Sequence, residues 1–223
     1  LHGIKPFRSG SIDQVIIDAA SVLCSCDSTL TEVFRSMISG ENILRPVENV
    51  TYEDGMGVSA WVGGRRVLVG NRELMKHYGV DLPPLDYEER YAQGGRQILY
   101  VANSGEAAAM YILSYKADKQ MKRALELLWS RDICICIYST DPNVTPQRIS
   151  ELYGFPAQMV RVIPAALYPQ VDRYLAPRER VRAGLLHTGA PASYVRAVAA
   201  AKACDSILTI ETALLLLSVV VGF

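Results

Sequence analysis

Apolar and polar positions follow two different patterns along this chain. In the first half, short alternating runs flank Gly63-Gly64 and again flank Asn103-Ser-Gly105. Glycine-containing turns between such runs predict two antiparallel hairpins, with short helices between them. From residue 118 onward, apolar residues at helical spacing alternate with short apolar runs, which predicts a parallel sheet with crossover helices. We therefore expect an α/β protein in which an antiparallel α+β unit accompanies a parallel sheet.

The segment Asp13-Gln-Val-Ile-Ile-Asp18 is an apolar, β-branched run that ends on a carboxylate. Such runs are typical of strands buried on both faces, so we expect it to be the first strand of the parallel sheet. Chemistry in open α/β sheets gathers beyond the carboxyl ends of the strands, which makes Asp18 the candidate nucleophile. On this interpretation residues 29–113 form a domain inserted into another domain, which is made of residues 1–28 and 114–223.

The second half of the chain supplies the other expected strands. These are Ile133–Tyr138, Val160–Ile163, Val181–Leu186 and Ser206–Ile210, with a helix at Ala192–Ala203 before the last one. The apolar residues 213–221 are fewer than the roughly 20 needed to cross a bilayer, so we expect a buried terminal helix there. A chain cut just before a membrane helix is the alternative.

Charge and cysteine content narrow the class of protein. The 23 basic residues balance the 23 acidic ones, so no bulk field attracts nucleic acid, and no nucleic-acid partner is expected. The five cysteines include the pairs Cys24/Cys26 and Cys134/Cys136, whose spacing suits neither a zinc knuckle nor a disulfide framework. We interpret them as reduced core thiols of a cytoplasmic protein.

Three segments resemble the cytoplasmic region of P-type ATPases, and specifically the heavy-metal-transporting branch. The segment from Asp13 to Leu23 resembles the phosphorylation motif, and Tyr138-Ser-Thr-Asp141 falls where the family has Leu-Thr-Gly-Asp. Asp54-Gly-Met-Gly57-Val and the run from Gly64 to Met75 look closely like the family's nucleotide-binding domain. The resemblance implies a haloacid dehalogenase-like Rossmannoid parallel sheet, with an inserted antiparallel α+β nucleotide-binding-type domain.

The resemblance also implies roles for particular residues. Asp18 takes the nucleophile position, Ser139 and Asp141 belong to the catalytic site, and the nucleotide-binding glycines are Gly55, Gly57 and Gly70. Two glycines in a strand can also simply form a bulge, so that interpretation of Gly55 and Gly57 stays open. The expected ligand is ATP.

Several catalytic positions of the family carry unsuitable residues here. Ala19, Ala20 and Ser21 replace the Lys-Thr-Gly that follows the nucleophile, and Leu167 occupies the expected place of a second lysine. No acidic residue occurs between Glu179 and Asp205, where the family's metal-binding loop would fall. Because Mg²⁺ needs several oxygen ligands, we expect no metal site and no bound Mg²⁺.

These substitutions favour a catalytically degenerate module. Our leading hypothesis is a pseudoenzyme or regulatory part of a membrane transporter-like protein that retains nucleotide binding. One alternative is an active cation-transporting ATPase fragment that hydrolyses ATP through Asp18, and another is a protein-interaction scaffold without a ligand. The expected partners are a nucleotide and, if the chain is a fragment, a membrane domain of the same polypeptide. The expected location is the cytoplasm or the cytoplasmic face of a membrane protein.

Overall fold

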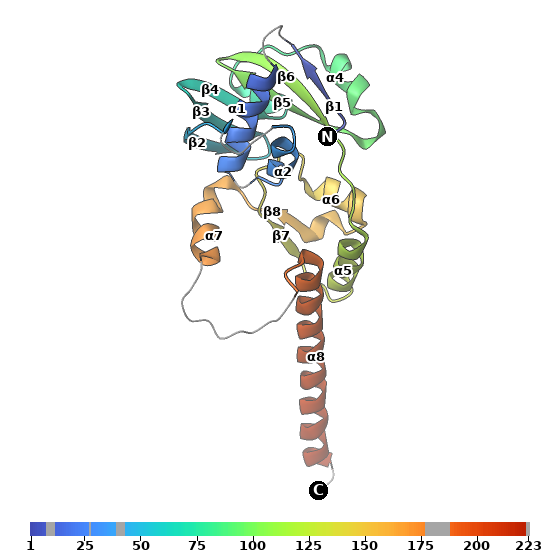
Figure 1. Ribbon diagram of the computed structural model, residues 1–223. Helices are drawn as coiled ribbons and strands as arrows, with labels where there is room; N and C mark the ends of the chain where they lie inside the picture. Colours follow the sequence, from blue (N-terminus) through green and yellow to red (C-terminus); the bar gives the residue numbers. More distant parts are fainter. Residues whose placement is uncertain (8–11, 27, 39–42, 177–187, 222–223) are drawn as a thin grey trace.

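The computed structural model describes residues 1–7, 12–26, 28–38, 43–176 and 188–221 (Figure 1). Its largest element is a six-stranded antiparallel sheet with the strand order β1-β6-β5-β4-β3-β2. The strands are β1 (Gly3–Pro6), β2 (Val47–Glu53), β3 (Gly57–Val62), β4 (Arg65–Gly70), β5 (Gln97–Asn103) and β6 (Glu106–Leu113). Both expected hairpins are present, since β3 pairs with β4 and β5 with β6 through the predicted turns.

Helices cover both faces of this sheet. On one face lie α1 (Ile12–Ser25) and α2 (Thr31–Arg35), whose apolar side chains form one core with β3, β4, β5 and β6. On the other face, α3 (Arg72–His77), α4 (Leu85–Ala92) and the short turn η2 (Gln93–Gly95) follow β4, and a second core forms there. Alternate residues of β4, β5 and β6 enter the two cores, which is the two-residue period of strands buried on both sides.

The expected strand at residues 13–18 is wrong, because this segment lies inside helix α1. Its apolar residues recur at the spacing of one helical face, where they pack on the sheet: Ile12, Val15, Ile16, Ala19, Ala20 and Leu23. The β-branched run was too short to distinguish a strand from a helix. Strand β1, which precedes it, pairs with β6, so residues 3–6 and 12–25 pack with the antiparallel unit.

A smaller parallel unit follows. Strands β7 (Ile135–Ile137) and β8 (Val160–Val162) form the two-stranded parallel sheet of the described residues. The other elements of this unit are helices α5 (Lys119–Trp129), α6 (Pro146–Tyr153) and α7 (Tyr168–Leu175), with the short turns η3 (Ala157–Met159) and η4 (Ala165–Leu167). The alternation of helix and strand was predicted, but the parallel sheet is smaller than expected. The expected strand Val181–Leu186 lies outside the described residues.

Helix α8 (Pro191–Val221) departs from two expectations. Ser206–Ile210 is helical, and the apolar residues from 213 to 221 are exposed instead of buried. The segment contains no glycine or proline after Pro191, so nothing in it interrupts a helix. Figure 1 shows that its C-terminal half extends away from the rest of the protein.

Candidate functional site

A cleft of about 250 Å³ lies between the two units. The antiparallel unit contributes the end of β2, the following turn with Gly55, and Gly57 at the start of β3. The parallel unit contributes the loops that follow β7 and β8, which include Ser139, Asp141 and Tyr168. The cleft therefore opens at the carboxyl ends of the parallel strands, where α/β sheets place their ligand sites.

Tyr168 and Asp54 join the two walls of the cleft. The Tyr168 ring packs edge-on against Tyr52 of the opposite wall, with 5.2 Å between ring centroids, and its hydroxyl donates to the Ser139 carbonyl at 2.7 Å. The Asp54 carboxylate accepts a hydrogen bond from the Ala165 backbone N–H. Burial, and secondarily the nearby Asp54 charge, raises the pKa of Tyr168, so its hydroxyl stays a donor at neutral pH.

Asp141 is buried in the loop after β7. Its carboxylate accepts hydrogen bonds from the Tyr115 hydroxyl and from the Asn143 backbone N–H, the second at 2.9 Å. Its own backbone N–H donates to the Ser139 hydroxyl at 3.2 Å. Burial raises the pKa of Asp141, and the hydrogen bonds from Tyr115 and Asn143 oppose that shift. The two predicted catalytic residues are thus adjacent, and both already have partners within the chain.

We expect the stability of Asp141→Asn to rise relative to that of the wild type as the pH increases from the unfolded-state pKa of the Asp141 carboxyl through its raised folded-state pKa. Because burial raises the folded-state pKa, the stability that protonated Asp141 contributes is present below the unfolded-state pKa and is lost as the pH passes the folded-state pKa. The asparagine variant cannot ionise and should lack this loss. Urea unfolding over a pH series measures the difference, with exposed Asp81→Asn as the control. A pH-independent difference between Asp141→Asn and the wild type would contradict this assignment.

The three predicted nucleotide-binding glycines lie close together but differ in what surrounds them. Gly57 and Gly70 face each other across β3 and β4, and a Cβ on Gly57 would stand 2.3 Å from the Val69 carbonyl oxygen. A Cβ on Gly70 would stand 2.2 Å from the Met56 carbonyl oxygen. Gly55 has a φ of +65° but open space around it, and the Asn71 side chain donates to its carbonyl at 2.8 Å. Backbone packing therefore explains Gly57 and Gly70 without a ligand, whereas Gly55 leaves room for one.

The described residues that line the cleft include acidic side chains but no basic ones. The carboxylates come from Glu53, Asp54 and Asp141, and no lysine, arginine or histidine accompanies them there. Apolar residues form much of the remaining wall: Val144, Val162, Ile163, Pro164 and Ala165. A triphosphate would meet like charge in this cleft, whereas an uncharged aromatic group would meet apolar walls and tyrosine rings.

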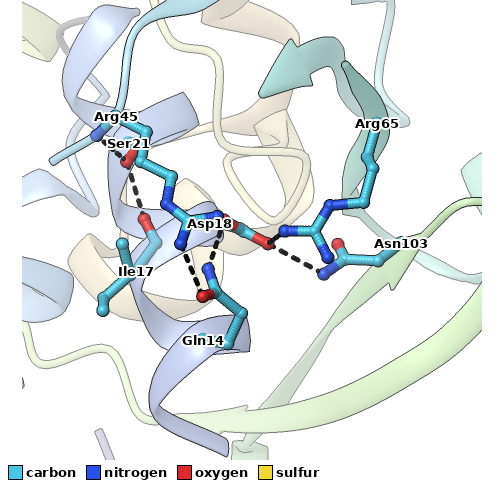
Figure 2. Close-up of polar contacts among 7 residues, drawn as sticks. All are labelled: Gln14, Ile17, Asp18, Ser21, Arg45, Arg65 and Asn103. Atoms are coloured by element: carbon cyan, nitrogen blue, oxygen red, sulfur yellow. Dashed lines mark hydrogen bonds and ion pairs between the residues drawn. The ribbon is translucent and has the colours of Figure 1, made fainter. Parts of the chain in front are cut away.

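Asp18 lies outside this cleft, in the middle of α1 and fully buried against the antiparallel sheet. Figure 2 shows four side chains that converge on its carboxylate. Gln14 donates at 2.8 Å and Asn103 at 3.1 Å, while Arg45 and Arg65 each approach to 3.4 Å. All of its oxygen acceptors thus face donors from the same chain, which is the arrangement of a structural ion-pair cluster.

The sequence did not reveal the residues that contact Asp18 or the residues that join the two walls of the cleft. Arg65 lies at the exposed end of the β3–β4 hairpin and its guanidinium still reaches Asp18, and Arg45 also contacts Asp18; neither contact was predicted. No local pattern links these residues, because they are 27 and 47 positions from Asp18. Tyr168 and Asp54 were likewise not singled out as contacts between the units.

The expected core position of the cysteines holds for Cys26 but not for the others. Cys26, one residue beyond α1, is buried and its thiol donates to the Val22 carbonyl at 3.0 Å, and Cys24 is half-buried within α1. Cys134, Cys136 and Cys204 are exposed. Within the described residues, no three histidine, cysteine or acidic side chains are grouped so as to hold a metal ion.

Curated relatives of this chain are copper-transporting P-type ATPases. It is 25% identical over 154 residues to "Copper-transporting ATPase 2" of Rhizobium meliloti, which covers 68% of this chain and 19% of the relative. It is 24% identical over 133 residues to a "Copper-exporting P-type ATPase" of Staphylococcus epidermidis, which covers 58% of this chain and 17% of the relative. The chain therefore spans less than a fifth of the length of these relatives. No protein-family model matches it.

Solved structures with partial similarity come from the same group. The N-domain of HMA6, a copper-transporting P-type ATPase, is 18% identical with a TM-score of 0.40, over 50% of this chain and 95% of that domain. A zinc-transporting PIB-type ATPase in the E2.Pi state is 16% identical with a TM-score of 0.42, over 72% of this chain and 26% of that protein. The curated relatives confirm the resemblance of this chain to heavy-metal P-type ATPases.

Proposed function

We propose that this chain is a cytoplasmic module of a heavy-metal P-type ATPase-like membrane protein, and that it binds a nucleoside without autophosphorylation. The antiparallel unit acts as the nucleotide-binding part, and the parallel unit is a reduced haloacid dehalogenase-like part. The observation that carries the proposal is the placement of Asp18. A carboxylate fixed in mid-helix by two arginines is not a free nucleophile, so hydrolysis through Asp18 is disfavoured.

The composition of the cleft supports the choice of ligand. Tyr52 and Tyr168 offer aromatic surface, the apolar residues after β8 offer a dry wall, and the turn at Gly55 leaves room beside it. These features suit an adenine and ribose. The acidic lining supplies no partner for phosphates, so the charge of a triphosphate should weaken binding instead of strengthening it. Mg²⁺ is not part of the proposed complex.

Calorimetric titration of the full chain in detergent micelles tests this proposal. We expect adenosine to bind at least as tightly as ATP, with no requirement for Mg²⁺. Gly55→Asn places a side chain in the open space of the cleft and should weaken adenosine binding by about tenfold, which corresponds to roughly 1.4 kcal/mol. Gly63→Asn is the matched control, because Gly63 also has a left-handed φ (+56°) and open surroundings but lies at a hairpin tip outside the cleft. Asparagine tolerates that conformation better than most residues.

Each part of the proposal has its own contrary result. An acid-stable phosphorylated protein formed with Mg²⁺ and ATP would show that autophosphorylation is retained. Equal adenosine affinity in the Gly55→Asn and Gly63→Asn variants would place the nucleoside elsewhere. The absence of any heat with either ligand would favour the scaffold hypothesis.

A further inference from the structure

A second cavity, of about 390 Å³, lies at the turn end of the β3–β4 hairpin. Its walls come from both strands, from Tyr78 at the end of α3, and from the turns that follow β3 and β5. The cleft described above begins at the opposite end of β3, at Gly57, and the two cavities have no lining residue in common. The second cavity is therefore a separate feature of the antiparallel unit.

Two aromatic rings hold the Arg66 side chain at this cavity. The guanidinium carbon of Arg66 lies 5.3 Å from the centroid of the Trp61 ring and 5.4 Å from that of the Tyr78 ring, both within cation–π distance. Trp61 is the partner of Arg66 in the pairing of β3 with β4, so the backbone fixes this contact. A guanidinium restrained in this way loses less freedom when it binds a ligand.

The positive charge of Arg66 has no counter-charge in the described part of the chain. No carboxylate there forms an ion pair with it, and no aspartate or glutamate is among the described residues that line the cavity. Arg65, the other arginine at the cavity, pairs with Asp18 at 3.4 Å (Figure 2). The second cavity is thus basic, whereas the cleft is acidic.

Other donors without acceptors accompany this guanidinium. Among the described residues, the Trp61 indole N–H and the backbone N–H groups of Gly64 and Gly105 have no hydrogen-bond partner, and all three residues line the cavity. Arginine pairs well with carboxylates and phosphates, and a tetrahedral phosphate offers more oxygens to the remaining donors than a planar carboxylate does. The cavity volume falls in the range of small-molecule sites, and buried Leu68 gives it an apolar wall, so an organic group also has room.

We propose that this cavity binds a phosphate monoester of a small organic molecule. Arg66 pairs with the phosphate, the Trp61 indole and the turn N–H groups donate to its other oxygens, and the organic group packs toward Leu68. The ligand is therefore distinct from the nucleoside proposed for the cleft. The inference does not depend on the proposed function, because the two cavities are lined by different residues.

Calorimetric titration of the full chain with phenyl phosphate, in detergent micelles, tests the role of Arg66. Arg66→Gln should weaken binding at least about tenfold, because it removes a charge-assisted hydrogen-bond donor. Arg66→Lys should restore only part of the affinity, since lysine keeps the charge but lacks the planar fork. Arg90→Gln is the matched control: Arg90 is an exposed residue of α4 on the same face of the sheet, and its loss changes the net charge equally.

The fluorescence of Trp61 provides a second measurement at the cavity itself. The chain has two tryptophans, so Trp129→Phe leaves Trp61 as the single one. Phenyl phosphate should change the emission of this variant, and uncharged phenol should not. In the Trp61→Phe variant, the remaining tryptophan should not respond to phenyl phosphate. Inorganic phosphate should compete only at higher concentration, because it lacks the organic group.

Four results would overturn the inference. Equal affinity of Arg66→Gln and Arg90→Gln for phenyl phosphate would exclude Arg66 as the phosphate partner, and unchanged Trp61 emission would place the ligand elsewhere. Inorganic phosphate that binds as tightly as phenyl phosphate would indicate a simple anion site. A phosphotyrosine peptide that binds far more tightly than phenyl phosphate would indicate a phosphorylated protein instead of a small molecule. Adenosine titration of Arg66→Gln should match the wild type, so a failure of the nucleoside proposal can be recognised separately.

Discussion

Asp18→Asn is expected to lower the free energy of unfolding by about 2 kcal/mol, because the buried carboxylate accepts from donors on all sides. Asparagine keeps one oxygen and presents an NH₂ group where the second oxygen stood. That NH₂ group would face a guanidinium or the side-chain NH₂ of Asn103. The loss is smaller than for a fully buried ion pair, since the Arg45 and Arg65 side chains are 36% and 43% exposed and can turn to water.

Urea unfolding of the full chain in nonionic detergent measures this loss. Asp13→Asn is the matched control, because Asp13 lies in the first turn of the same helix and is exposed. The loss of the Asp13 charge from the N-terminal end of the helix dipole should lower the free energy of unfolding by at most about 0.5 kcal/mol. Functional acids are commonly held at some cost in stability, so replacing one is often neutral or stabilising. An Asp18→Asn variant as stable as the wild type would therefore revive the nucleophile hypothesis.

The antiparallel unit could be predicted because its signals are local. Gly63-Gly64 and Ser104-Gly105 stand at turns with positive φ, and the alternating runs beside them form the strands. Asn71 caps α3, with its side chain accepting from the Glu73 and Leu74 backbone N–H groups. Such signals depend on a few neighbouring residues and not on the rest of the fold.

The predictions of a strand at residues 13–18 and of a strand and a buried helix within α8 failed for one physical reason. The residues of an apolar segment do not determine which other elements pack against it. The run before Asp18 suits either a buried strand or one face of a helix, and the sheet packed against it decides the outcome. Residues 206–210 likewise suit a strand, and only the continuous helix from Pro191 shows their surroundings. The same limit explains why Arg45 and Arg65 were not recognised as partners of Asp18.

Some of the predicted site residues lie together in the structure, and others do not. Ser139, Asp141, Gly55 and Gly57 come from two separate segments of the sequence, and the structure brings them to one cleft. Their catalytic and ligand roles stay predictions. Asp18 was predicted both from its place at the end of the expected strand and from the resemblance to a phosphorylation motif, and it lies outside the cleft in helix α1. The prediction for Asp18 depended on a strand, and the sequence segment forms a helix instead.

Gly57→Ala is expected to destabilise the protein by about 4 kcal/mol. The added methyl group would collide with the Val69 carbonyl oxygen and would stand 2.6 Å from the Gly70 Cα, both of which are backbone atoms fixed by the β3–β4 pairing. The φ of +137° adds strain, because residues with a Cβ rarely adopt it. The strands would have to separate at the point where the sheet meets the cleft.

Gly55→Ala is the matched comparison, because Gly55 lies two residues earlier, in the turn that precedes β3. No atom lies within 4 Å of its added methyl group. Only the left-handed backbone conformation should therefore lower the free energy of unfolding, by about 1 kcal/mol. Urea unfolding of both variants in the same detergent measures the ratio. If the two variants lost equal stability, the close approach of Gly57 to β4 would not be what requires glycine there. Gly57 would then have to be explained by a ligand in the cleft, as the resemblance to nucleotide-binding domains implies.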